Sequence, residues 1–113
     1  MSNPRIIAPA TALPLSELIA STPNGIASRI LSKTSGGSVT LFAFDAGEML
    51  SEHTTPFDAL AIVLDGELAL TIGGQPVVAT TGTIVRMPAS VPHALEAKSP
   101  VRMLLVMLRD VPA

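Results

Sequence analysis

Two histidines are the residues of this chain best suited to metal binding or proton transfer. His53 and His93 stand forty positions apart, each at the expected edge of a strand and beside a proline-bearing turn. Neutral imidazole is the commonest protein ligand for metal ions, and its pKa lies near neutral pH. No local motif joins the two residues, so they form one site only in a fold that brings their strands together.

The spacing of turn residues predicts that the chain consists of short strands. Glycines, single or in the pairs 36–37 and 73–74, separate runs rich in Val, Ile, Leu, Thr and Phe, which is typical of successive strands. The strands are expected near 38–45, 59–64, 67–72, 75–80, 83–87, 92–98 and 101–109. The turns at 65–66 and 73–74 predict a meander over 59–80. The only helical candidate is 15–20, and residues 1–14, with three prolines, are expected to form an arm.

The composition indicates one folded domain with an all-β core. Of the 113 residues 48% are apolar and 14% are charged, whereas soluble domains average about 25% charged residues. A disordered chain has the opposite balance, and the length suits a single domain. The pattern of strands fits either a sandwich or a barrel.

Charge and hydropathy exclude several kinds of partner. The longest apolar runs, 59–64 and 103–108, are far shorter than the roughly 20 residues of a membrane-spanning helix. A net charge of −2, with no Trp, no Tyr and no cluster of Lys or Arg, argues against nucleic acid. The chain has no Cys, and its N-terminal apolar stretch is broken by Pro9 and Pro14, so we expect no secretory signal and a cytoplasmic location.

Two spaced motifs carry a family resemblance. Gly47, His53 and Gly66 keep the frame of the first motif of the cupin family. In the same way Gly82, Pro88 and His93 keep the frame of the second motif. Over about 36–109 the chain resembles a small single-domain cupin of the RmlC-like, type 2 group. The resemblance implies a cupin jelly-roll barrel, or double-stranded β-helix, over 36–109. Residues 1–35 then supply a short N-terminal arm and the first strands of the same domain.

The resemblance also implies a metal site, which this sequence keeps only in part. Thr55 stands where cupins have a second histidine, and Ala59 stands where they have a glutamate. In the second motif Ser90 replaces Gly and Ala97 replaces Asn. The remaining ligands are His53 and His93. Because the only anionic ligand is lost, we expect weak binding of Zn, Ni or Cu rather than Mn or Fe.

Strand alternation places these side chains on defined faces. Both histidines are expected to point into the barrel, where they serve either as metal ligands or as hydrogen-bonded core residues. The nearest carboxylates, Glu52 and Asp58, are one residue out of phase with the inward positions. A bulge after Pro56 would turn Asp58 inward, as a third ligand or a general base.

The remaining inward positions predict a ligand pocket and a partner surface. Arg86 is interpreted either as an anchor for a substrate carboxylate or as an ordinary exposed arginine. The last strand is apolar on both faces, which indicates a homodimer. The pocket is expected to be lined by Thr55, Ala59, Ala61, Arg86, Leu95, Met103 and Met107.

Three classes of function remain open from the sequence. The interpretation that we favour is a protein that binds a small, largely apolar molecule in the barrel, with a divalent metal held weakly. The alternative is a metal-dependent enzyme of the cupin dioxygenase, isomerase or lyase kind, with His53 and His93 as ligands. The third is a dimer whose pocket is only a relic of the fold, because one fold carries many functions.

Overall fold

Strands make up most of the part of the chain that the structure describes. The structure is a computed structural model, and it describes residues 6–109. Its elements are η1 (Leu15–Glu17), β1 (Ile26–Thr34), β2 (Gly37–Phe44), β3 (Met49–His53), β4 (Asp58–Asp65), β5 (Glu67–Ile72), β6 (Gln75–Thr80), β7 (Ile84–Met87), β8 (His93–Ala97) and β9 (Val101–Leu108). Within 6–109 no helix has the length and hydropathy needed to cross a membrane.

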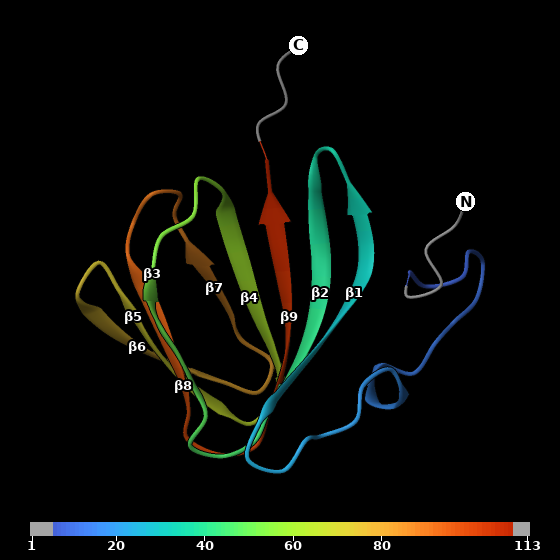
Figure 1. The fold of residues 1–113 in the computed structure, drawn as a ribbon, viewed down its shortest axis with the longest axis horizontal. Coiled ribbons are helices and arrows are strands. Elements are labelled where there is room, and N and C mark those ends of the chain that lie inside the picture. The colour runs from blue at the N-terminus through green and yellow to red at the C-terminus, as the bar shows by residue number, and fades with distance from the viewer. Residues whose placement is uncertain (1–5, 110–113) are drawn as a thin grey trace.

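The strands form two antiparallel sheets that face each other. The larger sheet has the order β1-β2-β9-β4-β7, and the smaller sheet has the order β3-β8-β5-β6. Figure 1 shows the smaller sheet at the left and the larger sheet running from the centre to the right, with the N-terminal arm beyond β1. This arrangement is a jelly-roll barrel, as the resemblance implied.

All seven predicted strands are present, with ends that differ by one residue at most. The structure adds two strands whose ranges were not specified in advance, β1 and β3. The helical candidate at 15–20 is reduced to the three-residue 3-10 turn η1, because Pro14 precedes it and the segment is too short to sustain an α-helix.

The predicted meander over 59–80 is wrong at its first turn. β5 pairs with β6 across Gly73-Gly74 as expected, but β4 pairs with β7 and β9, so the chain changes sheets at Asp65-Gly66. Gly66 has a φ of 101°, and a Cβ there would collide with the backbone oxygen of Pro100. The dipeptide therefore makes a tight corner between the sheets rather than a hairpin.

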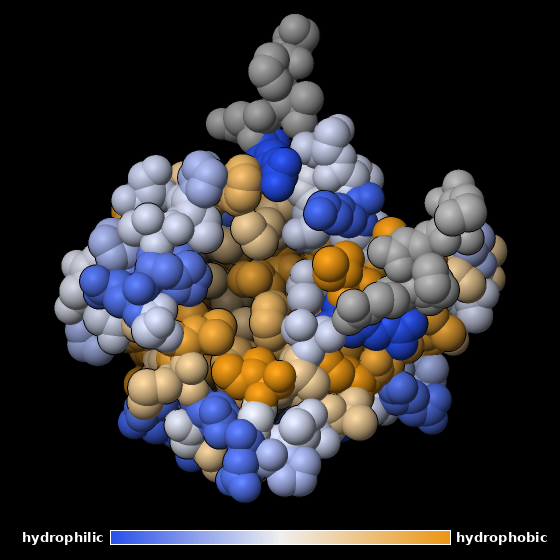
Figure 2. Space-filling model, in the orientation of Figure 1, coloured by the Kyte–Doolittle hydropathy of each residue, from blue (hydrophilic) through white to orange (hydrophobic). Residues whose placement is uncertain are grey.

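The space between the two sheets is filled mostly by apolar side chains. Phe44, Leu68, Leu70 and Met103 are almost completely buried there. Figure 2 shows apolar residues gathered in the hollow at the centre of the view, with hydrophilic residues around it. The core thus occupies most of the barrel, and the two histidines lie on the interior face of the smaller sheet.

Candidate functional site

The fold brings the two histidines into direct contact. β3 and β8 are neighbours, and His53 and His93 are register partners across them. The two ring centroids are 4.4 Å apart, with an angle of 65° between the ring planes. Two residues forty positions apart in the chain therefore form one bis-imidazole site.

Hydrogen bonds to the backbone fix the tautomer of each ring. Nδ1 of His53 lies 2.9 Å from the Ser51 carbonyl oxygen, and Nδ1 of His93 lies 3.3 Å from that of Val91. A carbonyl oxygen only accepts hydrogen bonds, so each Nδ1 carries the proton and donates it. In the neutral form of each ring the lone pair is then on Nε2. Metal-binding histidines in proteins are commonly oriented by such a backbone contact.

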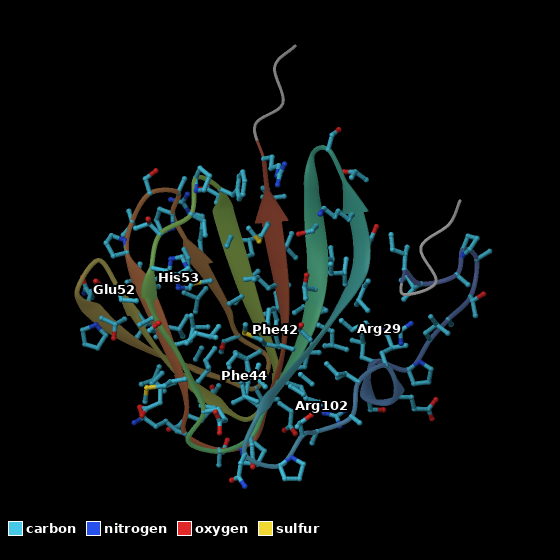
Figure 3. The ribbon with its side chains drawn as sticks, in the orientation of Figure 1. Arg29, Phe42, Phe44, Glu52, His53 and Arg102 are labelled. Atoms are coloured by element: carbon cyan, nitrogen blue, oxygen red, sulfur yellow. The ribbon has the colours of Figure 1, made fainter. Side chains whose placement is uncertain are left out.

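The two rings differ in their access to solvent. His93 is the one buried polar residue in the described part of the chain, at 5% exposure, whereas His53 is exposed. The pair therefore runs from the barrel wall toward the opening. Figure 3 shows His53 on the interior side of β3 and Glu52 on the outer side.

A small cavity of about 80 Å³ adjoins the histidines. It is lined by Phe42, Leu50, His53, Thr55, Ala59, Met87, His93, Leu95, Met103, Leu105 and Met107. The expected residues Thr55, Ala59, Leu95, Met103 and Met107 are all in this set.

The cavity wall differs from the predicted one at several positions. Ala61 lies on the same face but is packed in the core, and Arg86 does not line the cavity. Sequence reasoning missed Phe42, Leu50, Met87 and Leu105. Leu105 was predictable from the sequence, because it shares the inward face of β9 with Met103 and Met107. Leu50 lies three residues from His53, and a register irregularity between the two residues in β3 brings both to the same cavity. Phe42 and Met87 depend on sheet order, which the sequence pattern did not provide.

Asp58 and Arg86 are engaged with each other outside the cavity. A guanidinium nitrogen of Arg86 lies 3.0 Å from one carboxylate oxygen of Asp58. The other oxygen accepts a hydrogen bond of 2.8 Å from the Ala89 backbone N–H. The Ala89 N–H lowers the pKa of the Asp58 carboxyl, desolvation opposes this, and the Arg86 guanidinium lowers the pKa further, so the net shift is downward.

The structure therefore does not bring Asp58 to the histidines. The irregularity in the register of β4 lies between Val63 and Asp65, at the far end of the strand from Pro56. Without a bulge at the near end, Asp58 keeps its outward phase. Among residues 6–109, no group of three or more His, Cys, Asp or Glu side chains is placed to hold a metal ion.

Comparison with known proteins gives the fold a family. The family model described as the cupin domain matches residues 40–107. A conserved protein of unknown function from Streptococcus pyogenes is 30% identical, with a TM-score of 0.89 over 99% of this chain and 98% of that one. A cupin superfamily protein from Desulfitobacterium hafniense is 29% identical, with a TM-score of 0.85 over 94% and 96% of the two chains.

More distant structures share the architecture alone. KdgF from Halomonas sp. is 20% identical, with a TM-score of 0.71 over 81% of this chain and 86% of that one. No curated protein matches the chain. The family model covers more than half of the 113 residues and includes both spaced motifs of the sequence. The chain therefore belongs to the cupin family.

Proposed function

We propose that this protein binds a small, largely apolar molecule in the cavity beside His53 and His93. The observation that carries the proposal is the cavity itself, where two imidazoles with free Nε2 lone pairs meet a wall of aliphatic and thioether side chains. Small-molecule sites in proteins have this character, with a mostly apolar lining and a few convergent polar groups.

The size of the cavity limits the ligand. Its volume of about 80 Å³ lies well below the 300–1,000 Å³ typical of drug-sized ligands. Three methionines, at 87, 103 and 107, contribute to its wall. Methionine side chains are unbranched and adaptable, so the cavity can enlarge by rotamer changes when a short apolar group enters.

The donor set also fits a weakly held divalent metal. Nε2 of His53 and Nε2 of His93 would bind it, while Thr55 and Ala59 leave the other two positions of the cupin ligand set without a His or Glu. Two neutral nitrogen donors suit Zn, Ni or Cu better than Mn or Fe. Once bound, such an ion would act as a Lewis acid and orient the polar end of a ligand.

The cavity wall favours binding over catalysis. Within residues 6–109 its titratable side chains are the two histidines. Of the two carboxylates nearest in sequence, Glu52 lies on the outer side of β3 and Asp58 is paired with Arg86. A dioxygenase, isomerase or lyase would depend on a metal held by the two histidines. The enzyme hypothesis is therefore the alternative, and it is tested only after metal binding has been demonstrated.

The metal is tested by calorimetric titration of zinc and nickel into tag-free protein stripped with a chelator. We expect the wild type to bind one ion weakly, and both His53→Ala and His93→Ala to abolish that binding. Glu52→Ala is the matched control, because Glu52 adjoins His53 but lies on the outer side of β3. Binding that survives both histidine substitutions would place the ion elsewhere.

The ligand is tested on the metal-free protein. Methionine methyl NMR signals report the occupancy of the cavity, since three of the five methionines line it. We expect short apolar fragments to shift the signals of Met87, Met103 and Met107 and to leave that of Met49 unchanged. If no fragment shifts the three cavity methionines, the proposal of a ligand-binding barrel is wrong.

A further inference from the structure

A second polar group lies one residue beyond the end of β9. The guanidinium carbon of Arg109 lies 4.4 Å from the centroid of the Phe57 ring. The Arg109 backbone N–H donates a 2.9 Å hydrogen bond to the Gly36 carbonyl oxygen. Both the backbone and the head group of this arginine are thus held in place. A guanidinium stacked on a ring keeps the N–H groups at its edge free for another partner.

Strand register places this pair beyond one end of the cavity. Ala59 and Met107 are register partners in β4 and β9, and both line the cavity. Phe57 and Arg109 each lie two residues further along, one residue beyond the ends of β4 and β9. The ring contact between them and the hydrogen bond from the Arg109 N–H to Gly36 continue the strand pairing to this point, so the inward phase of Ala59 and Met107 extends to both residues. With a rise of about 3.3 Å per residue, the pair stands roughly 7 Å beyond Ala59 and Met107. Neither residue of the pair lines the cavity itself, and this register places Arg109 beyond the end of the cavity that Ala59 and Met107 line.

The other arginines near the barrel are engaged elsewhere. Arg86 is paired with Asp58. Arg29 and Arg102 donate hydrogen bonds to the carbonyl oxygens of Leu18 and Ser16, which tie the N-terminal arm to the larger sheet.

Arg109 has no acidic partner within the described part of the chain. Neither ion pair found between residues 6 and 109 includes it. Among residues 6–109, the cavity lining includes no Asp, Glu, Lys or Arg. A positive charge beside an apolar cavity is complementary to a molecule with one anionic end and an apolar body.

We propose that Arg109, positioned by Phe57, binds the carboxylate of a short-chain carboxylic acid whose apolar end enters the cavity. This inference rests on the proposed function of the cavity and adds the chemical class of its ligand. The planar fork of an arginine matches the two oxygens of a carboxylate. A single arginine balances the single charge of a monocarboxylate.

The test compares hexanoate with hexanamide, which has the same length and no charge. Both are titrated into chelator-treated protein, so that no metal can bind the carboxylate, and the methyl signals of Met103 and Met107 are followed. We expect the wild type to prefer hexanoate and Arg109→Gln to weaken hexanoate binding about tenfold, the size of a charge-assisted hydrogen bond that is partly exposed. Hexanamide binding should be the same in both proteins.

Lys33→Gln is the matched control. Lys33 is exposed on β1, two strands from β9. It pairs in register with Ser38, which pairs with Met107, so Lys33 lies at the same level of the sheet as Met107. It changes the net charge as Arg109→Gln does, but it should leave hexanoate binding nearly unchanged.

Three outcomes would overturn the inference. Equal binding of hexanoate and hexanamide would retain the ligand-binding cavity and reject the carboxylate anchor. Equal weakening of hexanoate binding by Arg109→Gln and Lys33→Gln would show that the loss of affinity comes from the change in net charge and not from a contact with Arg109. Binding of neither probe would reject the proposed function together with this inference.

Discussion

The chemistry of the site depends on which partner each polar side chain finds. Asp58 and Arg86 were candidates for the site from the sequence, but they bind each other on the outer face of the larger sheet. Their ion pair spans 28 positions and forms because Leu60 and Arg86 are register partners across β4 and β7. Arg109, which the sequence did not single out, is stacked on Phe57 and belongs to neither ion pair found between residues 6 and 109. Contacts between distant strands decide which arginine is paired with an acid, and no local sequence pattern encodes those contacts.

The Asp58 pair gives a prediction for stability against pH. Because the Ala89 N–H and then Arg86 lower the pKa of Asp58 in the folded protein, the unfolded chain binds its proton more readily as pH falls. The stabilisation is fully present above the ordinary pKa of 3.8 and is lost as pH falls below it. We expect Asp58→Asn to be less stable than the wild type at pH 7, with the difference shrinking below pH 4. Urea unfolding followed by circular dichroism at both pH values measures this, and a difference independent of pH would contradict it.

The histidine pair was predictable at the residue scale only through the spaced motifs. Two sets of spaced residues indicated a barrel in which the two imidazoles meet. They are Gly47, His53 and Gly66 in one segment, and Gly82, Pro88 and His93 in the other. The protonation of each Nδ1 could not be predicted, because it depends on the backbone carbonyls of Ser51 and Val91.

At the scale of elements, local signals located the strands but not their connections. Turn residues and apolar runs predicted seven strand ranges correctly. The pairing of β4 was missed, because a Gly after Asp is equally compatible with a hairpin and with a corner between sheets. The corner is decided by contact with the Pro100 backbone, 34 positions away in the sequence. Local propensity carries no information about such a contact.

Gly66→Ala tests the importance of this corner. At a φ of 101° the new Cβ would meet the Pro100 carbonyl oxygen, which is backbone and cannot move aside cheaply. We expect the free energy of unfolding to fall by about 2 to 3 kcal/mol or more. The control is Gly82→Ala, where φ is 84° and no atom lies within 4 Å of the added Cβ. It should cost only the strain of the left-handed backbone, about 1 kcal/mol. Urea unfolding by circular dichroism suits a protein without Trp or Tyr, and equal losses would contradict the collision.

At the scale of the whole molecule, the apolar excess of the composition is found on the outer face of the larger sheet. Register places apolar side chains of β4, β7, β9 and β2 side by side on that face. They are Val39, Leu60, Ile62, Ile84, Leu104, Val106 and Leu108. The N-terminal arm is tied to the same sheet through Arg29 and Arg102, and Leu41 and Ala43 are buried. Ile84 and Leu108 remain 59% and 48% exposed.

We propose that a second copy of the chain covers this face. The centre of the face is uncharged, and its rim carries both signs in Asp58 and Arg86, which suits a two-fold pairing of identical surfaces.

Replacing a residue of this face should therefore separate the two copies. Ile84 is 59% exposed and pairs in register with Ile62, so Ile84→Lys places a charge in the proposed interface without disturbing the core. Val78→Lys is the control, because Val78 is 64% exposed on β6 of the other sheet. Light scattering during size-exclusion chromatography should give twice the monomer mass for the wild type and for Val78→Lys, and the monomer mass for Ile84→Lys. A monomeric wild type, or a dimer that survives Ile84→Lys, would show that the apolar residues outside the barrel have another role.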